Sequence, residues 1–279
     1  MRKLVVFSIL LISIISCRPK DIDIEVKAAP PKLVAFTHIV PNNIMLVVLT
    51  KSFSVLEGNT ADSLETLLIS GATVKIKFDN KTFDFYEINP GIYASFSEAY
   101  EVNQDYELIA YSGNDTIHST TKMLPQVNFS SVLPSVEKLT SDTNVYLNLA
   151  FEDIPDISNW YLINIYKKQA GANGADGVNY FQNGNNTLAK SILLSDKEFN
   201  GTYQNNLLLK ELHHKDSIVV TLSNINEDYF KYLSFKIGGG SIFNQLNIEP
   251  VDYPTNIING YGFFNTHFPD IHFFDLGQF

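Results

Sequence analysis

The sequence has a single cysteine, which lies at position 17. One thiol cannot form an intramolecular disulfide, so a fold held together by disulfides is excluded. Basic residues are also scarce: Lys and Arg number 20 against 30 Asp and Glu, and the formal net charge is −10. A chain this acidic lacks the positive face that nucleic acid requires, so we expect no nucleic-acid partner.

The N-terminal apolar run is too short for a membrane-spanning helix. It extends from Leu4 to Ile15, 12 residues, whereas a spanning helix needs about 20. Arg2 and Lys3 precede it as a basic segment. This arrangement matches a signal peptide, whose apolar region has about 7–15 residues. We therefore predict that residues 1–16 are a signal peptide.

The only cysteine stands directly after this segment, in the sequence Ile14-Ile15-Ser16-Cys17. The sequence resembles the lipobox of bacterial lipoproteins. The resemblance implies attachment of a diacylglycerol to Cys17, cleavage after Ser16 and acylation of the new amino terminus. Two or three acyl chains, such as palmitate, anchor a protein stably. The alternative is an ordinary secretory peptide with an incidental cysteine.

Residues 17–31 are predicted to be a tether that ends in Pro30-Pro31, which favours an extended chain. Residue 18 is Arg, so the Asp that signals inner-membrane retention in some Gram-negative lipoproteins is absent. We expect the protein to be lipid-anchored in the outer membrane, on its periplasmic face or at the cell surface.

Short apolar stretches then recur between turn signals, as in all-β sandwiches. Val74, Ile76 and Phe78 alternate with lysines, the period-2 pattern of a half-buried strand. About seven strands are predicted in residues 32–125, the size of an immunoglobulin-like sandwich. These strands span residues 33–40, 44–50, 72–78, 82–87, 92–96, 106–111 and 116–123.

A second sandwich-like domain is predicted over residues 126–279, after a junction at 124–134. Its predicted strands span 144–151, 160–166 and 217–222, with a loop at 169–187 and further strands after Tyr261. One helix is expected near 225–237, because Asn224 to Glu227 resembles a capping box and three glycines follow the helix. The predicted fold class is all-β: two β-sandwich (immunoglobulin/fibronectin-like) domains with one short helix in the second.

Several short motifs, in a fixed order, resemble a family of Bacteroidota outer-membrane lipoproteins, the domain-of-unknown-function family 4249. They are Pro30-Pro31-Lys32-Leu33-Val34, Ser70-Gly71-Ala72-Thr73-Val74, Asn89-Pro90-Gly91-Ile92-Tyr93, Asn224 to Tyr232, Glu249-Pro250-Val251, Asn256-Ile257 and Gly260-Tyr261-Gly262-Phe263-Phe264. One departure is Asn259-Gly260, where members often have two glycines. The resemblance implies a gene beside a TonB-dependent outer-membrane transporter, and it implies no catalytic residues.

Three groups of residues have the chemistry of possible catalytic or metal sites. His213 and His214 are adjacent, so a strand would point them to opposite faces, and a solvated turn is the better interpretation. His267 and His272 flank a proline, which removes the helical spacing that suits zinc. Glu152, Asp153 and Asp156 lie in one turn, whereas glycoside hydrolysis needs carboxylates that face each other across a cleft. The sequence therefore predicts no catalytic residues, no metal site and no cofactor.

Three triplets resemble the short O-glycosylation motif of Bacteroidota periplasmic proteins: Asp62-Ser63-Leu64, Asp115-Thr116-Ile117 and Asp216-Ser217-Ile218. The candidate modified residues are Ser63, Thr116 and Ser217.

Three functions remain open at this point. The first is a membrane-anchored accessory or binding component of a TonB-dependent outer-membrane transporter, which is not an enzyme. The second is a structural or surface-coat lipoprotein. The third is a hydrolase with a dispersed site.

Overall fold

The structure is a computed structural model that describes residues 30–39, 44–53, 64–96, 100–138, 143–168, 186–199, 201–213, 215–238 and 254–279. The predicted signal peptide, Cys17 and nearly all of the tether lie outside these residues. So do Ser63, His214 and most of the predicted loop at 169–187. Residues 31–53 and 61–279 belong to one compact unit.

The fold is all-β, as predicted, with two sandwich-like assemblies and a short helix. The first sandwich contains β1 (Leu33–Ile39), β2 (Met45–Lys51), β3 (Thr73–Phe78), β4 (Lys81–Asn89), β5 (Ile92–Ser95), β6 (Asp105–Ser112), β7 (Asp115–Lys122) and β14 (Tyr261–Phe263). The second contains β8 (Phe129–Lys138), β9 (Thr143–Glu152), β10 (Trp160–Lys168), β11 (Asn186–Ser195), β12 (Thr202–Leu212), β13 (Ser217–Ile225) and β15 (Asp270–Asp275).

The strands of the first sandwich-like assembly are hydrogen-bonded into one continuous eight-stranded sheet. Their order is β14-β1-β2-β5-β4-β3-β6-β7. Its inward residues form a single core that includes Val47, Ile76, Tyr93 and Leu108. The predicted alternation in β3 is confirmed, because Val74, Ile76 and Phe78 are buried between more exposed neighbours. The seven predicted strands therefore lie close to β1–β7.

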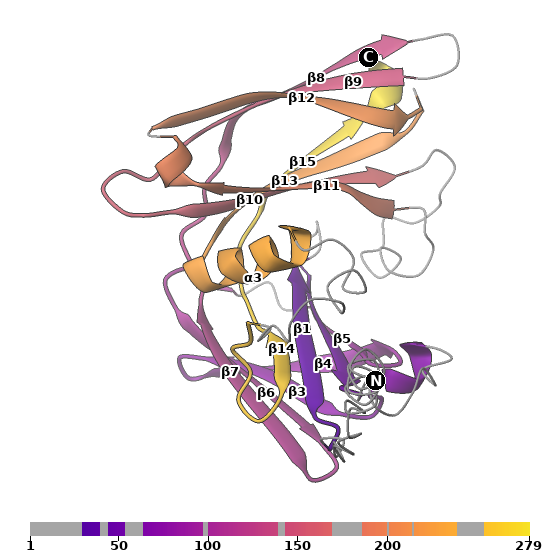
Figure 1. The fold of residues 1–279 in the computed structure, drawn as a ribbon, viewed down its shortest axis with the longest axis vertical. Coiled ribbons are helices and arrows are strands. Elements are labelled where there is room, and N and C mark those ends of the chain that lie inside the picture. The colour runs from indigo at the N-terminus through magenta and orange to yellow at the C-terminus, as the bar shows by residue number, and fades with distance from the viewer. Residues whose placement is uncertain are drawn as a thin grey trace, which may run out of the picture. The chain divides into compact units, whose positions relative to one another are not determined.

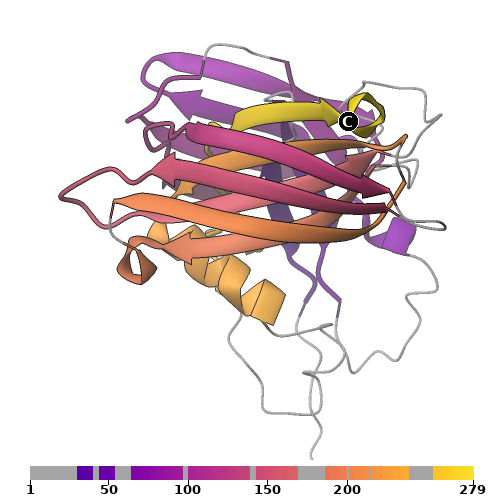
Figure 2. The same cartoon turned by 90° about the horizontal axis from the view of Figure 1, so that it is seen from above.

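The second sandwich has two facing layers, a four-stranded sheet ordered β11-β10-β13-β15 and a three-stranded sheet ordered β12-β9-β8 (Figure 1). Seen from above, β8 and β9 in pink and β12 in orange lie side by side in one layer (Figure 2). Their inward residues share one core, with Leu147, Phe151, Ile163 and Val220 at its centre. The predicted junction at 124–134 contains the start of β8, so its second part is strand and not linker.

The helix α3 (Glu227–Gly238) follows β13 directly, and it ends close to the predicted position. The predicted capping box is wrong by two residues. Asn226 is the cap, because its Oδ1 accepts the Tyr229 N–H at 3.0 Å, while Asn224 is buried at the end of β13. Glu227 instead pairs with Lys231 one turn along the helix. In the described part of the chain, no helix is long and apolar enough to cross a membrane.

The chain returns to the first sandwich near its C-terminus, which the sequence patterns did not indicate. β14 pairs in parallel with β1, and Ala35 lies opposite Gly262. Ile257 and Phe264 join the first core. This close approach depends on glycine: Gly262 has φ +107°, and a Cβ there would lie 2.0 Å from the Ala35 carbonyl oxygen.

Candidate ligand-binding pocket

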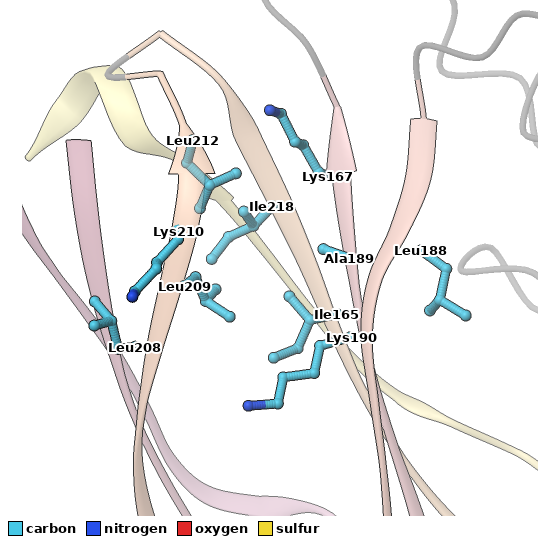
Figure 3. Close-up of a pocket in the computed structure, with 10 residues that line it drawn as sticks. All are labelled: Ile165, Lys167, Leu188, Ala189, Lys190, Leu208, Leu209, Lys210, Leu212 and Ile218. Carbon is cyan, nitrogen blue, oxygen red and sulfur yellow. The ribbon is translucent and has the colours of Figure 1, made fainter. Parts of the chain in front are cut away.

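A pocket of about 520 Å³ opens in the second sandwich, between the edge strands β11 and β12. Figure 3 shows ten residues that line it, from β10, β11, β12 and β13. The volume falls within the range of about 300–1,000 Å³ that is usual for small-molecule sites. The pocket is therefore large enough for a small ligand.

The floor of the pocket is apolar. Ile165, Leu209, Leu212 and Ile218 are each no more than 5% exposed, and all four belong to the core of the second sandwich. They come from inward positions of three strands, where period-2 alternation places apolar side chains. These four side chains therefore close the end of the core and expose almost no surface to the pocket.

Irregular pairing in both edge strands borders the pocket. Ile165 pairs with Lys190 and Tyr166 with Leu188, so Ala189 is an extra residue in β11. The pairing of β12 with β9 shifts in the same way between Leu209 and Leu212. Such β-bulges reorient side chains, and they occur more often than average beside functional sites.

Three lysines line this apolar space: Lys167, Lys190 and Lys210. Lys167 and Lys190 extend from β10 and β11 toward β12, whereas Lys210 and Leu208 point away from that space, to the other side of β12 (Figure 3). Lys167 Nζ lies 3.4 Å from Oδ2 of Asp216, whose side chain is 1% exposed. Lys190 and Lys210 form no ion pair with any residue that the structure describes. The lysines that enter the space are therefore Lys167, which is paired with Asp216, and Lys190.

Edge protection is the simplest alternative explanation for these lysines. Charged residues on edge strands prevent one sheet from pairing with another, and this suits Lys190 on β11 and Lys210 on β12. It does not explain Lys167, because β10 is a central strand between β11 and β13. Lys167 takes the inward position that follows Ile163 and Ile165, where the alternation predicts another apolar residue.

The site residues considered from the sequence lie elsewhere. Thr116 is the second residue of β7, after the exposed Asp115, and Ser217 starts β13 beside the buried Asp216. His213 is exposed. His272 Nε2 lies 3.0 Å from Asp270 Oδ2, while His267 is buried among other partners. Among the described residues, no group of three or more His, Cys, Asp or Glu could hold a metal ion.

Glu152 and Asp153 are hydrogen-bonded to neighbouring side chains. Asp153 Oδ1 accepts the Tyr161 hydroxyl at 2.5 Å and an Asn159 amide hydrogen at 3.3 Å. Glu152 accepts the Thr202 hydroxyl. The pKa of Tyr161 is raised, first by burial and then by its hydrogen bond to Asp153. These contacts hold a loop at one end of the sandwich, and Glu152 and Asp153 do not face each other across a cleft.

A second polar feature is a network of buried side chains around the start of α3. Asn226 Nδ2 donates to Thr121 Oγ1 and to Asn265 Oδ1, each at 2.9 Å. Asn265 Nδ2 lies 3.0 Å from Nδ1 of His267. The Thr37 hydroxyl bonds to the backbone of Asn265. We call Thr37, Thr121, Asn226, Asn265 and His267 the junction network.

The junction network holds His267 in its neutral form. Burial, followed by the effect of His38, lowers the pKa of His267 to about 4. Burial and nearby Lys236 lower the pKa of His38 to about 4 as well. Perturbed histidines are found at many active sites. The members of this network, however, hydrogen-bond to one another, and no carboxylate is among them, so we assign the network a structural role.

Sequence reasoning missed all three pocket lysines. A signal was present, since Lys190 and Lys210 interrupt apolar stretches at 188–194 and 207–212. The two strands that carry these lysines were not predicted, and the bulges depend on pairing between distant segments. Only the structure brings Lys167 and Lys190 to the same space.

Comparison with known proteins adds a family match. The model of a family described as a domain of unknown function, DUF4249, matches residues 19–267. No curated protein is significantly similar to the chain. Among solved structures, a DUF3823 family protein from Parabacteroides merdae ATCC 43184 is similar at 11% identity and a TM-score of 0.21, over 70% of this chain and 91% of that chain. A similarity this remote indicates neither a ligand nor an activity.

Proposed function

Because the chain belongs to the DUF4249 family, whose description states no activity, we propose a function from its own residues: a lipid-anchored binding component of an outer-membrane uptake system. In this proposal the signal peptide is removed and Cys17 carries the lipid. The two sandwiches then lie outside the cytoplasm, where they serve a TonB-dependent transporter in a Bacteroidota bacterium.

The observation that carries a binding role is the pocket between β11 and β12. Its volume suits a small molecule, and it brings Lys167 and Lys190 together at the end of the core of the second sandwich. Among the residues that the structure describes, Asp216 pairs with one of its lysines, Lys167. Binding fits this inventory better than catalysis, since general acid–base chemistry needs a group poised to exchange a proton.

The anchor is supported by the sequence alone. A basic segment, a 12-residue apolar run and a single cysteine follow one another at the N-terminus, and proline-rich sequence precedes β1. Such a tether would allow the folded part to reach a partner in the same membrane. A transporter partner is what the family resemblance implies.

Affinity capture from the native bacterium tests this proposal. A C-terminally tagged chain is expected in the membrane fraction, and its capture from solubilised membranes is expected to enrich one TonB-dependent transporter. Cys17→Ser is the matched control: it should leave the fold intact, release the protein from the membrane and abolish this enrichment. Repeated capture of the lipidated protein with no transporter would contradict the uptake role and favour a structural or surface-coat lipoprotein.

A further inference from the structure

We propose that the outer face of the three-stranded sheet β12-β9-β8 binds a neutral oligosaccharide. This face is turned away from the core of the second sandwich and toward the viewer in Figure 2. We call six of its side chains the outer platform: Leu133, Tyr146, Asn148, Gln204, Asn206 and Leu208. The inference goes beyond the proposed function, because it adds a second site that depends on neither the pocket nor the lipid anchor.

Strand pairing brings the outer platform together in the middle of the sheet. Asn148 on the central strand β9 lies directly opposite Asn206 of β12 and Leu133 of β8. In the next row, Tyr146 lies opposite Leu208. Residues that are directly opposite on one face have Cβ atoms about 4.5–5.5 Å apart. Their neighbours along each strand belong to the core, so the alternation turns these side chains outward as one surface.

The outer platform carries no charge, although the chain as a whole has a net charge of −10. The three positions that complete its rows are also uncharged: Ser131, Ser135 and Ala150. Charged residues of the three strands lie beyond it: Glu137 and Lys210 at one end, and Glu152 at the other. A charged ligand would meet no opposite charge in the middle of this face, so the surface suits a neutral one.

The fold does not require the asparagines of the outer platform. Asparagine is depleted in β-strands, and edge protection uses charged residues, which does not account for Asn148 on a central strand. Asn148 and Asn206 are both exposed, and neither side-chain amide has a hydrogen-bond partner among the residues described. An amide offers both donors and an acceptor, as a sugar hydroxyl does. The two groups can therefore pair in either direction.

Apolar side chains supply the other half of a sugar site. Leu133 is 61% exposed and Leu208 is 39% exposed, so both present hydrocarbon to solvent beside the two asparagines. Tyr146 is half-buried between their strands, and its hydroxyl donates to Glu137 at 3.3 Å. The C–H face of a sugar ring can rest on such side chains while its hydroxyls reach the amides. Apolar contacts with a few polar groups are the usual composition of a small-ligand site.

The size of the outer platform favours an oligosaccharide over a protein partner. Three paired strands span about 10 Å, and three alternate residues extend about 13 Å along each strand. A stable protein interface covers about 800 Å² on each partner, which is several times this area. A larger interface would also bury the charged rows at both ends, and charged residues are depleted from interface cores.

NMR titration of the soluble Cys17→Ser variant of the mature chain tests the proposal with four neutral probes: xylohexaose, mannohexaose, maltohexaose and laminarihexaose. At least one is expected to bind with a dissociation constant on the order of 0.1–1 mM, as suits an open surface. It should shift the side-chain NH₂ signals of Asn148 and Asn206, which are identified by their loss in Asn148→Ala and Asn206→Ala. The affinity should not depend on salt. Hexagalacturonate, with a carboxylate on every unit, should bind more weakly.

Surface variants locate the site. Asn148→Ala and Leu133→Ala should each weaken binding of the same hexasaccharide about threefold to tenfold. Both side chains are exposed, so the fold should be retained, and circular dichroism checks this. Asn80→Ala is the matched control, because Asn80 is an exposed asparagine in the turn between β3 and β4 of the first sandwich. Its affinity should equal that of the parent chain.

Three outcomes would overturn the proposal. The first is that none of the four neutral hexasaccharides binds the folded chain. The second is an equal effect of Asn148→Ala and Asn80→Ala. The third is a dimer in solution that Leu133→Ala converts to a monomer, since a second copy would then occupy this face. Each result leaves the transporter capture untouched, whereas failure of the capture with intact hexasaccharide binding would overturn the uptake role alone.

Discussion

The side-chain amide of Asn226 donates a hydrogen bond to Oδ1 of Asn265 across 2.9 Å, and this contact orients both amides. Asn226 Oδ1 accepts the backbone N–H of Tyr229, so its Nδ2 must be the group that points to Asn265. Asn265 then presents its own Nδ2 to His267, 3.0 Å from Nδ1. An amide NH₂ can only donate, so His267 Nδ1 must accept, and the order of hydrogen bonds from the helix cap selects a neutral ring.

Asn226→Ala should destabilise the fold strongly. The substitution removes the cap of α3, worth about 0.5–2 kcal/mol. It also leaves the buried Oδ1 of Asn265 without its donor, which costs about 1–3 kcal/mol. We expect the free energy of unfolding, measured by urea denaturation, to fall by about 2–4 kcal/mol.

Asn226→Asp is the matched control for this experiment. Aspartate is as good a cap as asparagine, so the bond from Tyr229 is kept. Its carboxylate cannot donate to Thr121 or Asn265, so the network alone is lost. A variant as stable as the wild-type chain would mean that these two hydrogen bonds contribute nothing, against the role assigned to the network.

Most of the first sandwich could be predicted from the sequence, because its strands follow local rules. Alternation marks β3, and Asn89-Pro90-Gly91 marks the turn before β5. The second sandwich was harder to predict. β11 and β12 have mixed apolar and polar residues without a clean period, and β14 has three residues and depends on a parallel partner far away in the chain. A short stretch of sequence does not show which distant segment it will pair with.

The candidate site could hardly be predicted at all. The pocket requires that Lys167 and Lys190 meet across paired strands and that two bulges fall at the same end of the sandwich. The motifs that carry the family resemblance do not lie at the pocket. Asn226, Gly262 and Phe263 belong to those motifs, and they lie in or near the junction network and its neighbouring core. These three motif residues therefore contribute to the junction network and the core beside it, and none of them lines the pocket.

Gly262→Ala should disrupt the pairing of β14 with β1. At φ +107° a Cβ would lie 2.0 Å from the Ala35 carbonyl oxygen and 2.9 Å from the Ala35 nitrogen, so the two backbones would have to separate. We expect a loss of about 3 kcal/mol or more in the free energy of unfolding, or failure to fold.

The glycine in the β6–β7 turn provides the comparison for Gly262. Gly113 also has a positive φ, +59°, but a Cβ there would have no atom within 4 Å. Gly113→Ala should cost only about 1 kcal/mol, the strain of a left-handed residue. Equal losses in the two variants would show that the backbone strain of a positive φ, and not a clash with Ala35, is what requires glycine at position 262.

Lys167→Met should destabilise the second sandwich by about 3 kcal/mol, because it removes a cation that pairs with the buried carboxylate of Asp216. The double variant Lys167→Met with Asp216→Asn should recover most of that loss, since neither charge remains. Thermal and urea unfolding of the four proteins form a double-mutant cycle. If the double variant were as unstable as Lys167→Met, the ion pair with Asp216 would not account for the loss. The ion pair would then not be the reason why Lys167 takes this position.

Glycan mapping of the native protein by mass spectrometry should favour Thr116 over Ser217. Asp115 is exposed at the start of β7 and Thr116 is half-exposed beside it, so a modifying enzyme can reach both residues in the folded chain. Asp216 is 1% exposed and bonded to Lys167, which hides the acidic residue of the other triplet. A glycan on Ser217 with none on Thr116 would contradict this order and would require modification before folding.

Acid should weaken the fold through His267. Its pKa is about 4 in the folded chain, against an ordinary value of 6.5, because the ring is buried and His38 lies nearby. Between these two values the unfolded chain binds a proton that the folded chain does not. The stabilisation is therefore complete above pH 6.5, and it is lost as the pH falls toward 4, with a slope of at most about 1.4 kcal/mol per pH unit from this group.

His267→Asn isolates this effect, because asparagine can still accept from Asn265 but does not titrate. We expect its free energy of unfolding, subtracted from that of the wild-type chain at each pH, to give a difference that shrinks steadily from pH 6.5 to 4. Carboxylates such as Glu87 are common to both proteins, so they cancel in the subtraction. A difference that stays constant across this range would show that the ring is not held neutral, and the order of hydrogen bonds from Asn226 to His267 would then be wrong.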